Sequence, residues 1–221
     1  MSQHFKLSIL TGIFVAGLLA ANLLGSKITI LFGISVSVGI FAYPLTFLIT
    51  DAIGEVYGKQ KAKQVVWSAL IAQILVLILT YISVKMPAAG RYAFNEEYVT
   101  VFNGSIRMII ASLIAFTVSQ TYDIWAFDWW KKKTQGKYLW LRNNASTMIS
   151  QIIDTLLFMF IAFYGISDKF TVGFILELSL SFWLFKIAFA IIDTPFAYLL
   201  VKWLKKPGKS DITSDPITTT T

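Results

Sequence analysis

The chain has 221 residues, of which 56% are hydrophobic and 14% are charged, with a net charge of +7 and a mean hydropathy of +0.68. Soluble domains carry about 25% charged residues, because water solvates their surface. Lipid requires no such surface, so the composition predicts an integral membrane protein and excludes a water-soluble domain. The lack of cysteine excludes disulfides and thiolate metal sites, and the single histidine, His4, stands outside any apolar segment.

Six segments are apolar and long enough to cross a bilayer, which takes about 20 helical residues. We therefore predict an all-α integral membrane protein with about six transmembrane helices. They lie at Phe5–Leu24, Ile40–Tyr57, Ala62–Val84, Ile106–Phe127, Asn143–Tyr164 and within Phe170–Leu204. We expect the first to be a retained helix, because no small-residue signal-peptide cleavage site follows it. The last exceeds one span, which predicts a short interfacial helix before the sixth crossing.

The segments outside these spans have their own patterns. Ile28–Gly39 is rich in Ile, Val, Ser and Gly and nearly alternates in polarity, which fits either a small hairpin or a re-entrant segment. Residues 1–210 are predicted to form one transmembrane domain, because no linker interrupts them. Residues 211–221 are polar and end in four threonines, which predicts a disordered tail.

Lysine and arginine gather at one set of span ends. These residues are Lys6, Lys59, Lys61, Lys63, Lys131, Lys132, Lys133, Lys137, Arg142, Lys202, Lys205, Lys206 and Lys209. Because cytoplasmic loops carry an excess of Lys and Arg, six crossings with both termini in the cytoplasm place all of them inside. We predict a multi-pass protein of the cell inner membrane in this orientation. Membrane topology then explains the positive net charge without nucleic-acid binding, and the lipid bilayer is the expected partner.

Carboxylates that interrupt the apolar spans are the main candidates for function. They are Asp51, Glu55, Asp123, Asp154 and Asp193. Each ionised carboxylate near a bilayer centre costs roughly 2.5–3.5 kcal/mol, so such groups are kept where they face a polar cavity or one another. The alternative is that some cap helices or pair with lysines at the interface. Asp51 and Glu55 are four residues apart and share one helix face.

A repeated pattern links the fourth and fifth spans. Ser-Gln-x-x-Asp occurs at residues 119–123 and again at residues 150–154, so Gln120 shares a helix face with Asp123, as Gln151 does with Asp154. The two spans run in opposite directions, so Asp123 should lie nearer the cytoplasm and Asp154 nearer mid-membrane. We interpret the repeat as the lining of a shared polar pocket rather than as chance.

The entry to the fifth span is polar, with Arg142, Asn143 and Asn144 in sequence. One asparagine can be explained as an N-cap, but not the whole run. Pro44 within the second span and Pro195 in the sixth predict kinks beside carboxylates, as a mid-membrane binding site requires.

Taken together, these residues resemble the family of queuosine-precursor transporters, once grouped with vitamin-uptake transporters. The resemblance runs over roughly residues 8–204, and the ordered set of motifs is more specific than any one of them. The matching residues are Asn22, Lys27, Tyr43–Asp51, Glu55–Gly58, Arg107, Ala111–Phe116, Ser119, Gln120, Asp123, Trp140–Asn144, Ser146, Thr147, Ser150, Gln151, Asp154, Thr155, Phe158, Lys186 and Asp193–Pro195.

The resemblance implies import of the 7-deazaguanine bases preQ0 or preQ1, or of queuine, for queuosine modification of tRNA. It implies a transporter rather than an enzyme, with no cofactor, no metal and no direct contact with nucleic acid. A carboxylate and an amide can bind the edge of such a base, and aromatic rings can stack on its face. The expected substrate-binding residues are Asn22, Tyr43, Asp51, Glu55, Phe116, Gln120, Asp123, Arg142, Asn143, Asn144, Gln151, Asp154, Lys186 and Asp193.

Two other readings are compatible with the sequence. The chain could be the substrate-binding membrane subunit of a multi-component, ATP-driven importer of vitamins or nucleobases. Gly12, Ala16 and Ala20 would then form the small-residue face that docks an energising partner. The other reading is an intramembrane enzyme, but HExxH and GxSxG motifs are lacking. Energy coupling and oligomeric state, a homodimer included, do not follow from these residues.

Overall fold

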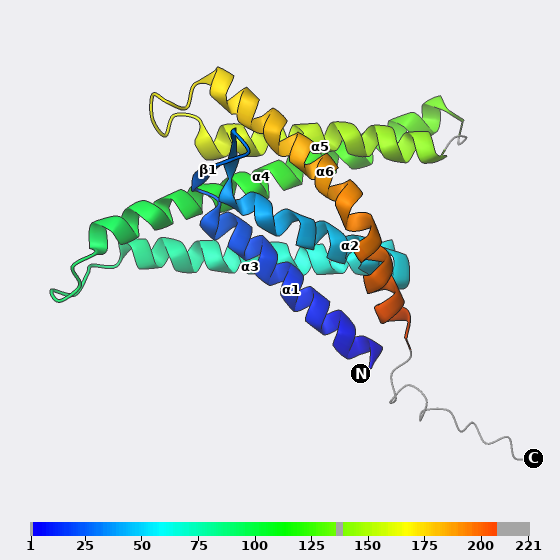
Figure 1. Cartoon of the computed structure of the whole chain (residues 1–221), viewed down its shortest axis with the longest axis horizontal. Helices are drawn as coiled ribbons and strands as arrows, with labels where there is room; N and C mark the ends of the chain where they lie inside the picture. The colour runs from blue at the N-terminus through cyan, green and yellow to red at the C-terminus, as the bar shows by residue number, and fades with distance from the viewer. Residues whose placement is uncertain (1, 136–138, 207–221) are drawn as a thin grey trace, which may run out of the picture.

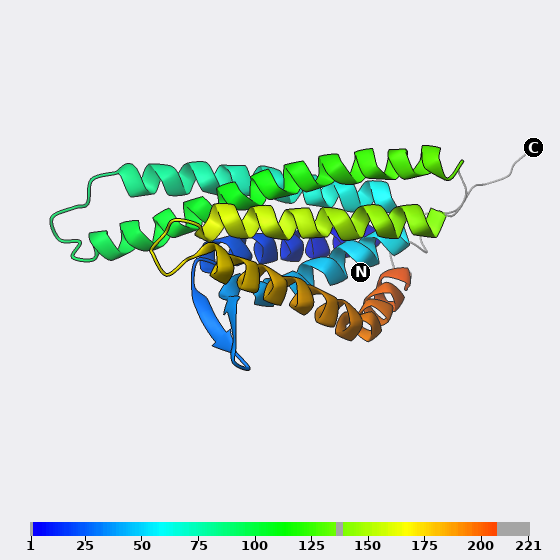
Figure 2. The same cartoon turned by 90° about the horizontal axis from the view of Figure 1, so that it is seen from above.

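The computed structural model of the chain describes residues 2–135 and 139–206. Its elements are α1 (Gln3–Leu24), β1 (Ile28–Leu31), β2 (Ile34–Ser37), the 3-10 helix η1 (Val38–Ala42), α2 (Tyr43–Tyr57), α3 (Lys59–Lys85), α4 (Asn95–Lys133), α5 (Leu139–Phe163) and α6 (Val172–Lys205). The helices lie side by side as an elongated bundle, and the strands form a small hairpin on its flank (Figure 1, Figure 2). The predicted all-α class is confirmed.

Four helical segments are long and apolar enough over their described residues to cross a membrane. They are Gln3–Leu24, Val38–Tyr57, Gln60–Lys85 and Asn95–Ser119. The protein is therefore a multi-pass membrane protein. Helices α5 and α6 have 25 and 34 residues, which suffices for a crossing, but some of their side chains lie outside the described part. The count of six crossings stays a prediction.

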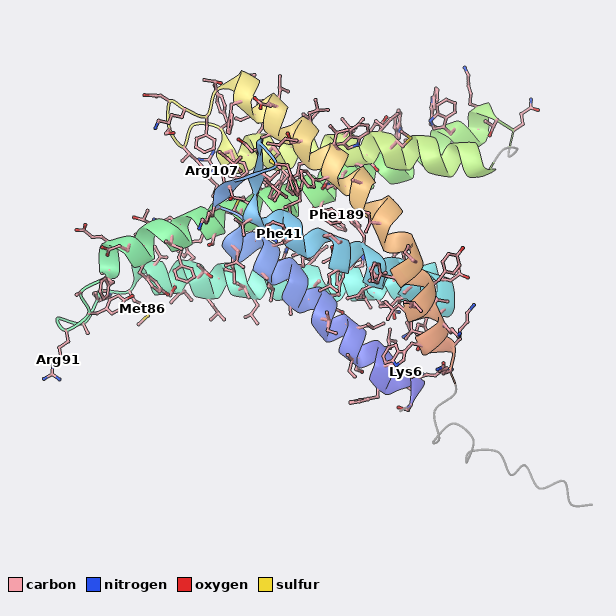
Figure 3. All side chains as sticks on the ribbon, in the orientation of Figure 1. Lys6, Phe41, Met86, Arg91, Arg107 and Phe189 are labelled. Atoms are coloured by element: carbon pink, nitrogen blue, oxygen red, sulfur yellow. The ribbon has the colours of Figure 1, made fainter. Side chains whose placement is uncertain are left out.

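The two ends of the described chain meet at one end of the bundle, where α2 also joins α3 at Gly58 (Figure 1). We call this the α2–α3 end. The buried Lys6 donates from Nζ to the carbonyl oxygens of Trp203, at 2.8 Å, and Lys206, at 2.6 Å. Carbonyls in the last turn of a helix accept no hydrogen bond from an amide of the same helix. The Lys6 ammonium therefore caps the C-terminus of α6 and ties it to α1 (Figure 3).

A second cation caps a helix C-terminus at the opposite end of the bundle. Arg107 of α4 donates from Nε to the carbonyl of Ile161, at 2.7 Å, and from Nη2 to the carbonyl of Tyr164. These carbonyls end α5, so the guanidinium caps that helix and fixes it against α4 (Figure 3).

The segment between α1 and α2 is a hairpin and not a re-entrant loop. β1 pairs antiparallel with β2, and Phe32 and Gly33 at its turn have φ of +51° and +80°, as in a type I′ turn. Ser37 anchors the base, because its hydroxyl donates to the Gly25 carbonyl at 2.6 Å and accepts from the Gly39 amide at 3.2 Å. A Cβ on Gly39 would lie 2.6 Å from the Ala21 carbonyl oxygen, so only glycine allows this close approach.

Two apolar cores occupy the two halves of the bundle. The hairpin core joins the hairpin and η1 to α4, α5 and α6, through Val36, Ile40, Met108, Ala111, Ala115, Phe158, Met159, Ala162, Phe163, Ile175, Leu178 and Phe182. The terminal core lies nearer the α2–α3 end and joins α1, α2, α3 and α6, through Leu10, Phe14, Ile49, Ala52, Ile53, Val65, Ala69 and Leu204. Among the side chains that the structure describes, none from α4 or α5 belongs to the terminal core, and at that end the ribbons of the α4–α5 pair lie apart from α2 and α3 (Figure 1).

The structure corrects two expectations about helix ends. We expected an interfacial helix before the sixth crossing, but α6 is one continuous helix that begins at its N-cap Thr171, because nothing in the sequence interrupts it before Pro195. Pro195 inside α6 removes a helix hydrogen bond, and the C-terminal part of α6 turns away from the direction of the rest of the helix (Figure 2). Pro44, by contrast, lies in the first turn of α2 and kinks nothing, since a first-turn amide needs no partner.

The clamp between the chain ends predicts a stability effect. Lys6→Met keeps the apolar stem but removes the ammonium, leaving two helix-end carbonyls without their donor. We expect the free energy of unfolding to fall by roughly 1–3 kcal/mol, as for a buried hydrogen bond to a charged group. Thermal unfolding in detergent measures it, with the exposed Lys27→Met as the control. Equal melting temperatures for the two variants would contradict the clamp.

Candidate functional site

A cavity of about 260 Å³ lies inside the bundle, and all six α-helices contribute to its wall. Its lining is Phe14, Leu18, Thr46, Phe47, Thr50, Val66, Leu70, Ser112, Phe116, Ser119, Gln151, Asp154, Phe158 and Lys186. This size is just below the roughly 300–1,000 Å³ of most small-molecule sites, so it suits a compact ligand. We call it the central cavity.

Lys186 of α6 is the centre of the polar side of this cavity. Its Nζ lies 3.4 Å from Asp154 Oδ2, 3.4 Å from Gln151 Oε1 and 3.1 Å from Thr155 Oγ1. The Thr155 hydroxyl donates to the Gln151 carbonyl at 2.8 Å, so its oxygen is free to accept from the ammonium. The Lys186 side chain is 9% exposed and that of Asp154 is 26% exposed. The ammonium is therefore the more enclosed partner, and the carboxylate keeps a surface toward the cavity.

Asp154 also contacts the fourth helix. The Ser119 hydroxyl lies 3.5 Å from Asp154 Oδ1 and 3.1 Å from the carbonyl of Phe116. Because α4 and α5 run antiparallel, the first residue of one Ser-Gln-x-x-Asp pattern meets the last residue of the other. The repeat thus contributes to one polar patch from two helices.

Aromatic rings form much of the remaining wall. Phe14, Phe47, Phe116 and Phe158 come from four different helices and all line the cavity. Phe158 stacks on Phe182, with ring centroids 6.5 Å apart and planes at 29°. Lys186 Nζ lies 5.7 Å from the centroid of the Phe182 ring, so the aromatic stack also supports the ammonium. The cavity therefore offers ring faces next to hydrogen-bond donors and acceptors.

A second, larger cavity of about 650 Å³ adjoins the first toward the α2–α3 end, and we call it the vestibule. Its lining is Thr50, Asp51, Gly54, Glu55, Ala62, Lys63, Val66, Trp67, Phe116, Thr117 and Thr121. Thr50, Val66 and Phe116 line both cavities, one residue from each of α2, α3 and α4. The carboxylates of Asp51 and Glu55 lie here, exposed, and do not line the central cavity.

The fourteen residues predicted for substrate binding thus have different places. Phe116, Gln151, Asp154 and Lys186 are brought together around the central cavity, and Asp51 and Glu55 lie in the vestibule. Asn22 lines neither of these two cavities, and its amide donates to the carbonyl of Leu18 in its own helix at 3.0 Å. The side chains of Tyr43, Gln120, Asp123, Arg142, Asn143, Asn144 and Asp193 lie outside the described part of the structure.

Some site residues were missing from the sequence-based set. Thr155 and Ser119 hold the ion pair, and the latter begins the repeated pattern. Thr155 is four residues after Gln151, a spacing that predicts a shared helix face and could have found it. Thr46 and Ser112 also line the cavity, and their signal was their place in the stretches Tyr43–Asp51 and Ala111–Phe116 that carry the family resemblance. Among the described residues, no group of three His, Cys, Asp or Glu side chains could hold a metal ion.

The ion pair predicts a coupled stability effect. Asp154→Asn and Lys186→Met should each destabilise the protein, because each leaves an uncompensated charge in the membrane interior. The loss should stay below the roughly 3–5 kcal/mol of a fully buried pair, since Asp154 is 26% exposed. The double variant should recover part of the loss in thermal unfolding experiments. The same changes at two exposed residues adjacent in sequence, Asp168→Asn and Lys169→Met, provide the control. Strictly additive effects of the changes at residues 154 and 186 would contradict the ion pair.

Comparison with known proteins shows the family to which the chain belongs. Residues 37–200 match the family described as "Putative vitamin uptake transporter". A "Probable queuosine precursor transporter" of Bacillus subtilis is 31% identical over 192 residues, which is 86% of this chain and 82% of that protein. The "Queuosine precursor transporter" of Escherichia coli is 28% identical over 155 residues, 70% of this chain and 67% of that protein. No solved structure matches the chain. A match over most of the sequence, together with the apolar helices, shows that the chain belongs to the vitamin uptake transporter family.

Proposed function

We propose that this protein imports a queuosine precursor, a 7-deazaguanine base, across the cell inner membrane for queuosine modification of tRNA. The names of the relatives support this substrate class. The observation that carries the proposal is the central cavity, in which Asp154, Gln151 and Lys186 form a hydrogen-bonding patch next to aromatic rings.

The patch is complementary to a guanine-like edge. Such an edge has neighbouring N–H donors, which one carboxylate can accept in a bidentate manner. Asp154 Oδ1 and Oδ2 are suited to this contact, and the Gln151 amide can both donate and accept. Lys186 can donate to a ring carbonyl oxygen of the ligand in exchange for one of its three contacts with Asp154, Gln151 and Thr155. Phe116 and Phe158 can stack on the planar face, a contact worth roughly 1–3 kcal/mol per base.

The ion pair also explains how the carboxylate is kept in a membrane interior. An isolated ionised Asp154 would cost roughly 2.5–3.5 kcal/mol, and an isolated Lys186 a similar amount. Paired, the two charges compensate each other and stay available to a ligand that has both donors and acceptors. A planar, polar and compact base has this property, whereas an apolar ligand would bury the patch without partners.

The reading as a binding subunit of an ATP-driven importer is not favoured. The relatives are named as transporters, and the small-residue face of α1 alone would be weak evidence for a docked ATPase. Within the chain, α1 packs on α2 beside Gly17, where an added Cβ would lie 3.5 Å from a methyl group of Thr46.

For orientation we propose that the α2–α3 end faces the cytoplasm. Lys6, Lys61 and Lys63 in the first turns of α1 and α3, and Lys202 and Lys205 in the last turn of α6, lie at this end, where the two ends of the described chain also meet. An excess of Lys and Arg on one side is typical of cytoplasmic loops.

The substrate proposal predicts that the cavity carboxylate is needed for uptake. In cells that cannot make or import queuosine precursors, the wild-type chain should restore queuosine in tRNA when preQ0, preQ1 or queuine is supplied. Asp154→Asn should lower apparent affinity roughly tenfold to hundredfold, as for a lost charged hydrogen bond. Asp168→Asn, the same change in an exposed loop, should transport like wild type. Failure of the wild-type chain to restore queuosine would refute the substrate.

Orientation is tested by labelling single cysteines, since the chain has none of its own. Gln60→Cys lies exposed at the α2–α3 end, and Gly90→Cys lies in the loop at the opposite end. We expect a membrane-impermeant maleimide to label the first only in inside-out vesicles and the second only in right-side-out vesicles. The reverse pattern would invert the proposed topology.

A further inference from the structure

The three residues that line both cavities mark the passage between them. Along α2, Thr46 and Phe47 line the central cavity, Thr50 lines both, and Glu55 lines the vestibule. Along α3 the order is the same when the helix is followed toward Gly58, with Leu70 in the central cavity, Val66 in both and Lys63 in the vestibule. On both helices, the boundary between the central cavity and the vestibule therefore lies at the same depth, that of Thr50 and Val66.

Phe116 is the largest side chain at this boundary, and it comes from α4. Helix α4 belongs to the α4–α5 pair, which lies apart from α2 and α3 at the α2–α3 end (Figure 1). The same helix continues into the vestibule with Thr117 and Thr121, both of which are exposed. On the other side of the central cavity the hairpin core is closely packed, with Met159, Ala162 and Ile175 at most 1% exposed. Among the described residues, the boundary at Phe116 is therefore the side on which the central cavity adjoins the vestibule.

We propose that Phe116 is the gate between the central cavity and the vestibule, and that a bound ligand leaves the cavity past this ring toward the α2–α3 end. The proposal rests on the proposed function for the nature of the ligand and for the direction of transport. Its physical content is steric: the ring fills the space through which a planar ligand must pass. A smaller side chain opens the passage, and a larger one closes it.

The test measures access without any transported substrate. In the cysteine-free chain, Ser112→Cys reports on the central cavity and Thr121→Cys on the vestibule. A membrane-impermeant methanethiosulfonate is applied in vesicles that expose the α2–α3 end. We expect Thr121→Cys to react faster than Ser112→Cys. Adding Phe116→Ala should speed the reaction of Ser112→Cys about tenfold, equivalent to ~1.4 kcal/mol of barrier, and leave Thr121→Cys unchanged. Phe116→Trp should slow it.

Phe47→Ala is the matched control, because Phe47 lines the central cavity but not the vestibule. It should leave the reaction of Ser112→Cys nearly unchanged. The gate is refuted if Phe47→Ala speeds the reaction as much as Phe116→Ala, or if no change at residue 116 alters it. An intact labelling pattern in a protein that restores no queuosine would refute the substrate and leave the gate standing.

A separate observation on α3 concerns the closed side of the cavity. Gln73 is 0% exposed, and neither its amide nitrogen nor its amide oxygen has a hydrogen-bond partner among the described residues. It follows Val66 by seven residues and Leu70 by three, so it continues the face of α3 that lines the cavity. Burying an amide without partners is unfavourable, which makes this position an exception to the pairing of buried polar groups.

We infer that Gln73 is hydrated in a second conformation, in which the route opens from the central cavity toward the hairpin end. Transport requires such a conformation, and the amide stabilises it relative to the one described. Gln73→Met has a similar volume and removes the unpaired amide. We expect it to raise the melting temperature, speed labelling of Thr121→Cys and slow uptake, because it shifts the population toward the present conformation. The exposed Gln64→Met should do none of these.

A lower melting temperature of Gln73→Met would show that the amide has a partner in the resting protein, which contradicts the inference. Unchanged labelling and uptake would contradict it as well, even if the melting temperature rises. The labelling readout does not depend on the substrate, so this result also stands apart from the proposed function.

Discussion

The ion pair between Lys186 and Asp154 is the interaction around which the interior of this protein is organised. It joins α6 to α5, and Ser119 extends it to α4. A charge in the hydrocarbon region is costly alone, so these helices must pack with the two groups in contact. The Gln151 amide and the Thr155 hydroxyl then satisfy the ammonium further. The pair therefore fixes the packing and at the same time creates the polar side of the cavity.

Two cations outside the cavity hold the bundle around this centre. Lys6 caps the end of α6 at the α2–α3 end, and Arg107 caps the end of α5 at the opposite one. In each case a positive charge meets the carbonyls that a helix leaves without partners. Apolar packing is less even: among the described side chains, the hairpin core includes residues of α4 and α5, whereas the terminal core does not. The vestibule hollows the bundle toward the α2–α3 end.

Because of this uneven packing, the central cavity adjoins a larger space at one end of the bundle and a closely packed core at the other. The central cavity combines ring faces with a compensated pair of charges, which suits a planar base with both donors and acceptors. Phe116 lines both this cavity and the vestibule, and on the opposite side the Gln73 amide has no hydrogen-bond partner among the described residues. These features fit an uptake transporter whose vestibule lies toward one end of the bundle.

Much of the architecture follows from the sequence alone, because composition, span length and charge distribution act locally. The all-α class, the hairpin as one of two readings and the shared helix face of Gln151 and Asp154 all depend on short spacings. The partner of Asp154 does not, since Lys186 lies 32 residues away and only helix packing brings it near. Packing likewise assigned Asp51 and Glu55 to the vestibule. Helix periodicity determines which residues share a face, whereas the meeting of two faces is decided by tertiary contacts between distant segments.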